Sequence, residues 1–142
     1  GGRVVRRREL RDHIFRIVFS QPFHQPGEMP EQMELHFAEL PEADEKDLSY
    51  IREKAEKVAE KTEEIDAFLN EHTTGWKTTR MNKVDLSILR LAVYEMRYDE
   101  DVPVGVAIDE AVELAKKYSG DEGPAFVNGV LAKLAKLDAS EV

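Results

Sequence analysis

The chain has 142 residues, which is enough for one compact domain and too few for a catalytic domain with a separate regulatory one. Charged residues make up 35% of it and cysteine is absent, which excludes disulfides, thiolate metal sites and cysteine nucleophiles. The net charge of −9 by itself argues against a nucleic acid partner, because a polyanion repels an acidic surface.

The first predicted helix runs from about Val4 to Ser20 and differs in charge from the remainder. Residues 1–19 hold six arginines and two acidic residues, a net charge of +4, so the other 123 residues carry −13. Apolar residues at helical spacing predict one buried stripe, made of Leu10, Ile14, Ile17 and Val18. A basic segment attached to an acidic remainder is typical of an interaction end.

A second face of this helix combines arginines with phenylalanines. It spans an arc of about 80° on the helix and is made of Arg8, Arg11, Phe15 and Phe19. Guanidinium groups neutralise phosphates and aromatic rings stack on unpaired bases, so this face suits single-stranded RNA. A second interpretation stays open, in which the phenylalanines widen the core face and the arginines are only solvated.

The middle of the chain predicts a short helix and then a long one. Prolines cluster between residues 22 and 41, and we expect the short helix after Pro30. The long helix ends near Thr73 to Gly75. Its apolar seam alternates steps of three and four residues through Leu48, Ile51, Ala55, Val58, Thr62, Ile65 and Leu69. Its charged residues, Lys54 among them, are expected on a solvated outer face rather than in a binding site.

Residues 83–96 predict a central helix, because the apolar residues of this stretch leave hardly any polar arc on the helix. Arg90 is the only basic residue between Leu86 and Met96, and a buried charge is costly without a partner. We expect Arg90 to pair with Asp85 or Glu95, or to meet a ligand at a surface opening.

Two further helices are predicted, one opened by Pro103 and ended by Gly120, and a last one begun by Pro124. Gly129 within the last helix indicates that a neighbouring helix approaches closely there. No segment alternates apolar and polar residues as a strand does. The sequence therefore predicts an all-α fold of about six or seven helices with short connections.

Catalysis and metal binding are not expected. The histidines are scattered without the paired helical spacing of a zinc protease, at His13, His24, His36 and His72. A glycine-rich phosphate loop is absent from the sequence as well. We therefore expect no enzyme, and no catalytic residue, metal or cofactor.

A membrane partner is not expected either. The longest unbroken apolar stretch, Val102–Ile108, has only seven residues and contains a proline and a glycine. The opening residues do not have the pattern of a secretory leader. We therefore expect a cytoplasmic protein.

Several blocks of the sequence resemble the NusB transcription antitermination factors. The blocks are VDLSILRLAVYEM at 84–96, DVP at 101–103, AIDEAVELAK at 107–116 and FVNGVL at 126–131. Their order and spacing are specific to that family, and the arginine-rich first helix extends the resemblance over nearly the whole chain. Residues 21–80 match in helix layout more than in motif.

The resemblance implies one domain over residues 1–142, built from two packed small helical bundles at about 3–72 and 76–138. It also implies binding to boxA-type single-stranded RNA as a heterodimer with NusE, a small-subunit ribosomal protein. This complex helps RNA polymerase to read through terminators, especially in ribosomal RNA operons. Positions carried over from the family as near the RNA or its border with NusE are Arg7, Arg8, Arg11, Phe19, Asp85, Arg90 and Phe126. Phe15 joins this set from the helical arc alone.

Two other functions stay open. One is a helical adaptor that binds only protein. The other is the RNA-binding domain of a larger RNA cytosine methyltransferase, although this chain has neither a dinucleotide-type fold nor a cysteine nucleophile. A homodimer is a further alternative, since an apolar partner surface can pair with itself and cover the RNA site.

Overall fold

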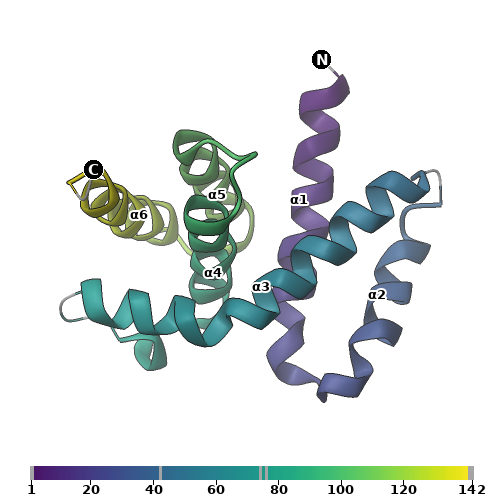
Figure 1. Cartoon of the computed structure of the whole chain (residues 1–142), viewed down its shortest axis with the longest axis horizontal. Helices are drawn as coiled ribbons and strands as arrows, with labels where there is room; N and C mark the ends of the chain where they lie inside the picture. The colour runs from purple at the N-terminus through teal and green to yellow at the C-terminus, as the bar shows by residue number, and fades with distance from the viewer. Residues whose placement is uncertain (1, 42, 74, 76, 141–142) are drawn as a thin grey trace. The chain divides into compact units, whose positions relative to one another are not determined.

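The computed structural model describes residues 2–41, 43–73, 75 and 77–140, and within these ranges every regular element is a helix (Figure 1). The α-helices are α1 (Gly2–Ser20), α2 (Met29–Ala38), α3 (Glu45–His72), α4 (Lys83–Tyr98), α5 (Val104–Tyr118) and α6 (Gly123–Ser140). Short 3-10 helices are η1 (Gln21–Phe23), η2 (Pro26–Glu28) and η3 (Thr78–Arg80). The all-α prediction is confirmed, with six α-helices in the described ranges where about six or seven are expected. None of the described helices is long and apolar enough to cross a bilayer.

The chain forms two compact units that divide within α3. Unit 1 covers residues 1–60 and unit 2 covers residues 61–142. Because α3 is one continuous helix of 28 residues, its first part belongs to unit 1 and its last part to unit 2. The bundle limits of 3–72 and 76–138 stay a prediction of the sequence.

Unit 1 has a core of apolar side chains from α1, α2 and the first part of α3. Pro30 stands in the first turn of α2, where a helix does not require its backbone N–H. The guanidinium of Arg52 on α3 lies 5.0 Å from the centre of the Phe37 ring on α2. The buried apolar side chains of unit 1 include Ile14, Phe15, Ile17, Val18, Met33, Phe37, Ile51, Ala55 and Val58.

The seam of α3 is buried largely as predicted, through Ile51, Ala55, Val58, Ile65 and Leu69. Lys54 departs from the prediction, because it is buried rather than on the solvated face. Its Nζ donates a hydrogen bond to the Tyr50 hydroxyl at 2.8 Å and lies 4.8 Å from the centre of that ring. A lysine stem can cover apolar surface while its ammonium keeps a polar partner, and the ring one turn earlier supplies that partner.

In unit 2, α4 is the central helix, as predicted. Its neighbours α5 and α6 pack against it and against each other (Figure 1). The buried apolar side chains of α4 include Leu86, Ile88, Leu89, Leu91, Ala92 and Val93. Those of α6 include Val127, Val130, Leu131 and Leu134. The apolar composition of residues 83–96 thus reflects a helix that is covered by others on several sides.

Two glycines of α6 lie in opposite environments. Gly129 is exposed, and a Cβ added there would meet no atom within 4 Å among the described residues, so the predicted close helix approach at this position is wrong. The close approach occurs at Gly123, the first residue of α6, where a Cβ would overlap the side chain of Ser119. The absence of a side chain at Gly123 therefore permits the tight connection from α5 to α6.

Candidate functional site

The arginines predicted to bind RNA, Arg7, Arg8 and Arg11, lie at the surface of unit 1, and we call these three the basic face. Arg7 and Arg8 are exposed, and Arg11 is half-buried. The side chains of Arg3 and Arg6, which contribute to the positive charge of this segment, lie outside the described residues. Arg7, Arg8 and Arg11 lie within five residues, so this stretch of α1 concentrates cationic side chains that suit phosphate groups.

Arg16 contributes to the charge of α1 but is engaged inside unit 1. Its Nη2 lies 3.1 Å from Oε2 of Glu39 and donates a hydrogen bond to Oε1 at 3.3 Å. Glu39 follows the last residue of α2, so this ion pair connects α1 to the end of α2. We therefore do not count Arg16 with the basic face.

The phenylalanines of the predicted face differ from one another in exposure. Phe15 is only 2% exposed, which means that the core interpretation holds for it and its ring cannot stack on a base in this structure. Phe19 is half-buried and stacks on Phe15, with ring centroids 6.1 Å apart. Phe23, in η1, is 61% exposed and lies 5.6 Å from Phe19 between ring centroids.

Phe23 was not among the predicted site residues. A signal for it exists, because positions 15, 19 and 23 continue one series of four-residue steps. Pro22 predicts that the helix ends before it, so the four-residue series is not expected to continue to position 23. The chain instead continues as the 3-10 helix η1, so the aromatic series extends past the end of α1. We call Phe15, Phe19 and Phe23 the aromatic ladder.

Asp85 is 6% exposed and its carboxylate is bonded inside unit 2. Its backbone N–H donates to Oδ1 of Asn82, the N-cap of α4, at 2.8 Å, and its own Oδ2 accepts from Nδ2 of Asn82 at 2.9 Å. The hydroxyl of Ser119 donates to Oδ1 of Asp85 at 2.6 Å. Asn82 therefore caps α4, and the Asp85 carboxylate ties this cap to the end of α5.

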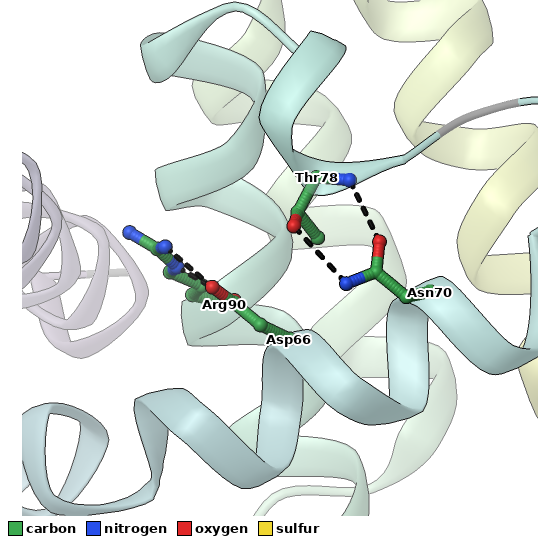
Figure 2. A network of polar contacts seen from close by, with 4 residues as sticks. All are labelled: Asp66, Asn70, Thr78 and Arg90. Carbon is green, nitrogen blue, oxygen red and sulfur yellow. Dashed lines mark hydrogen bonds and ion pairs between the residues drawn. The ribbon is translucent and has the colours of Figure 1, made fainter.

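Arg90 is half-buried on α4 and pairs with a partner that differs from both predicted ones. Its Nη2 and Nε bond the two carboxylate oxygens of Asp66 on α3 at 2.7 and 2.9 Å (Figure 2). One turn further along α3, Asn70 accepts from the backbone N–H of Thr78 at 2.8 Å and donates to its hydroxyl at 3.2 Å. These contacts fix the last part of α3 to α4 and η3, so the predicted pairing of Arg90 with Asp85 or Glu95 is wrong.

Phe126 is half-buried in the first turns of α6, four residues after Glu122, whose carbonyl accepts its backbone N–H at 3.0 Å. The predicted site residues therefore fall into two sets. Those of unit 1 lie on α1, and those of unit 2 lie on α4 and α6. Within unit 2, Asp85 and Arg90 already have protein partners.

Two of the histidines that look scattered in the sequence lie together in unit 1. The rings of His13 on α1 and His36 on α2 meet edge to face, with centroids 6.1 Å apart. Together with Glu39 they form a group that could hold a metal ion. A spacing of 23 residues across two helices leaves no local motif from which this pairing could be predicted.

A model of the NusB family matches residues 8–136, which is most of the chain. The chain belongs to the NusB family. Family membership confirms the resemblance found in the sequence. It makes the chain a transcription antitermination factor, a class of protein that is not enzymatic.

The relatives and solved structures agree with NusB membership. The transcription antitermination protein NusB of Agathobacter rectalis is 51% identical over 129 residues, covering 91% of this chain and 98% of that protein. The structure of T. maritima NusB has a TM-score of 0.82 at 32% identity and covers 92% of this chain and 90% of its own. A crystal structure of the antitermination factors NusB and NusE with dsRNA has a TM-score of 0.78 at 26% identity, covering 92% of this chain and 96% of its own.

Proposed function

We propose that this NusB-family chain binds boxA-type single-stranded RNA together with NusE and supports read-through by RNA polymerase, especially in ribosomal RNA operons. The observation that carries the proposal is the combination of Arg7, Arg8 and Arg11 on α1 with the exposed end of the aromatic ladder in the same unit. The solved complex of NusB and NusE with dsRNA supports RNA and NusE as the partners. The complex then joins the polymerase antitermination assembly in the cytoplasm, where nascent RNA is made.

Each residue has a distinct part in this proposal. The arginines of α1 neutralise phosphates, while Phe19 and Phe23 offer ring faces to unpaired bases and Phe15 supports them from the core. In unit 2, Phe126 contacts the RNA or its border with NusE. Asp85 and Arg90 act indirectly, by positioning α4 through the protein contacts described above. The acidic remainder of the chain favours a basic partner such as a ribosomal protein.

A binding experiment across a salt series tests the RNA part of the proposal. The affinity for a fluorescent boxA oligonucleotide is measured for the unmodified chain, for the double variant Arg8→Glu/Arg11→Glu, and for Lys57→Glu as a control. Lys57 is an exposed lysine on α3 in the same unit. Each lost phosphate contact lowers the slope of log affinity against log salt by about 0.7, so the double variant loses affinity and about 1.4 of slope. An equal loss of RNA affinity in Lys57→Glu would mean that the effect comes from net charge and not from contacts of Arg8 and Arg11 with the RNA.

The same measurement with and without NusE tests the joint binding. We expect NusE to raise the affinity for boxA RNA, because the two proteins present one longer RNA surface. Equal affinity in both conditions would contradict joint binding. Absence of RNA binding even with NusE would instead support a protein-only adaptor. Sedimentation of the chain alone tests whether it forms a dimer. Sedimentation with NusE then tests whether a second copy competes with NusE, since the dimer would dissociate when NusE binds.

The methyltransferase alternative is less well supported. The relative from Agathobacter rectalis is matched over 98% of its length and is named as an antitermination protein. A nucleotide-dependent enzyme domain therefore has no counterpart in that relative. The RNA experiments above address this chain directly, since they require no enzymatic activity.

A further inference from the structure

In the described part of unit 1, two buried imidazole nitrogens have no hydrogen-bond partner. His13 is 6% exposed, and the Nδ1 atoms of both His13 and His36 are buried. Within the described residues neither Nδ1 atom has a hydrogen-bond partner. Buried polar atoms in native proteins are almost always bonded, so two such atoms in one place indicate a missing partner.

Glu39 completes a converging set of donor atoms. Its Oε2 lies 3.9 Å from Nδ1 of His13, and ligand atoms of His13, His36 and Glu39 all lie within 4.8 Å of one another. His36 and Glu39 are three residues apart at the end of α2, so they lie on one face of that helix. His13 approaches from α1, and the set therefore bridges two helices.

The donor types and their protonation suit a transition metal. Two imidazole nitrogens and one carboxylate oxygen form a common set for Zn²⁺ and related ions, with a fourth position open to water. Burial lowers the pKa of both His13 and His36, and the nearby Arg16 guanidinium lowers them further. These effects outweigh the nearby carboxylates, which raise the two pKa values, and so favour the neutral ring that coordinates metal.

Arg16 holds the carboxylate of Glu39 from the other side, at 3.1 Å from Oε2. Such outer contacts orient metal ligands in known sites, although the positive charge also competes with the ion. Ligand atoms in a tetrahedral zinc site stand roughly 3.4 Å apart, as its bond lengths require. The described atoms, within 4.8 Å, need only side-chain adjustment to reach that spacing.

We propose that His13, His36 and Glu39 form a binding site for a divalent transition metal ion such as Zn²⁺. The bound ion accepts a lone pair from one imidazole nitrogen of each histidine and from one carboxylate oxygen, and water completes its coordination. It links α1 to α2 and so fixes the helix that carries the basic face. The site is structural, and its existence does not depend on whether the chain binds RNA.

Metal binding to the full chain, prepared without a histidine tag and freed of metal with a chelator, tests the proposal. Zn²⁺ is titrated by calorimetry, and Co²⁺ is followed by its visible absorption, which reports the number of ligands. We expect one equivalent per chain, the intense absorption of four-coordinate Co²⁺, and a rise in the midpoint of thermal unfolding on adding Zn²⁺.

Three variants separate the site from incidental binding. His36→Gln and Glu39→Gln should each lower the Zn²⁺ affinity by more than the roughly 10–100-fold that loss of an outer contact costs. His24→Gln is the matched control, since His24 is a half-buried histidine of the same unit that pairs with Glu28 at 3.0 Å. Glu39 is half-exposed, so its variant preserves the fold even if His36→Gln does not. Failure of the unmodified chain to bind Zn²⁺, or equal affinity in Glu39→Gln and His24→Gln, would overturn the proposal.

Discussion

The guanidinium of Arg90 on α4 donates hydrogen bonds of 2.7 and 2.9 Å to the two carboxylate oxygens of Asp66 on α3. The side chains of Arg90 and Asp66 are 14% and 23% exposed, so water screens the pair only in part. Bidentate geometry of this kind is the strongest form of arginine–carboxylate contact. The pair therefore satisfies the only basic residue between Leu86 and Met96 and anchors α3 to α4.

Replacement of Asp66 by asparagine should lower the free energy of unfolding by about 2 kcal/mol, because it leaves a mostly buried guanidinium without its countercharge. Urea unfolding followed by circular dichroism measures this change. Asp109→Asn on the exposed face of α5 is the control and should change stability by less than about 0.5 kcal/mol. Equal stability of the two variants would mean that the Arg90–Asp66 pair contributes nothing.

The N-cap of α4 gives a second prediction. Asn82→Ala removes the acceptor for the Asp85 N–H and should cost about 1 kcal/mol of stability. Asn82→Ser retains a capping oxygen but lacks the amide donor to the Asp85 carboxylate, so its loss should be smaller. Chemical denaturation of the three proteins ranks them. A serine variant as unstable as the alanine one would contradict the capping role.

Substitutions in the aromatic ladder should separate effects on stability from effects on RNA binding. Phe15→Ala opens a cavity in the core of unit 1 and should cost about 3–5 kcal/mol of stability. Phe23→Ala removes an exposed ring and should leave stability nearly unchanged while weakening boxA binding roughly tenfold. Denaturation and fluorescence anisotropy on the same preparations test both. Unchanged RNA affinity in Phe23→Ala would remove that ring from the proposed interface.

The two glycines of α6 should respond in opposite ways to the same substitution. Gly129→Ala adds a methyl group in open space within a helix and should raise stability by about 0.5–1 kcal/mol. Gly123→Ala forces its Cβ against the Ser119 side chain and should lower stability by about 1–3 kcal/mol. Thermal unfolding measures both shifts. Destabilisation by Gly129→Ala would show that α6 is packed there after all.

The helices and the central position of α4 could be predicted from the sequence because they follow from local periodicity. The seam of α3 alternates steps of three and four residues, and the apolar residues of 83–96 lie nearly all round the helix, so both patterns can be read without knowing the packing partners. The length of α1 and the end of α3 near residue 73 follow from equally local signals.

Contacts between distant segments could not be predicted in this way. Asp66 lies 24 residues before Arg90, on a helix whose charged residues are predicted to be solvated, whereas Asp85 and Glu95 lie on the same helix as Arg90 and are the partners that local spacing predicts. The burial of Phe15 depends on α2 and α3, which determine how wide the core face of α1 becomes. The meeting of His13 with His36 depends on the same packing.

The candidate site was therefore predicted in part. The arginines of α1 are at the surface because their charge keeps them there, and this much follows from residue type. Residue type does not determine which phenylalanine is exposed. Phe15 is buried, and the exposed ring is Phe23, which joins the aromatic series because η1 continues the chain in a helical conformation past Pro22. The tertiary core decides which ring of the series faces solvent.

The graded burial of the aromatic ladder bears on the entropy of binding. Phe15 is buried in the core, Phe19 packs on it, and the exposed Phe23 packs on Phe19, so the outermost ring is restricted on one side before a ligand binds. A side chain that is already confined loses little rotamer freedom when a base stacks on it. The ladder thus allows a chain with few exposed aromatic rings to offer a preorganised stacking platform.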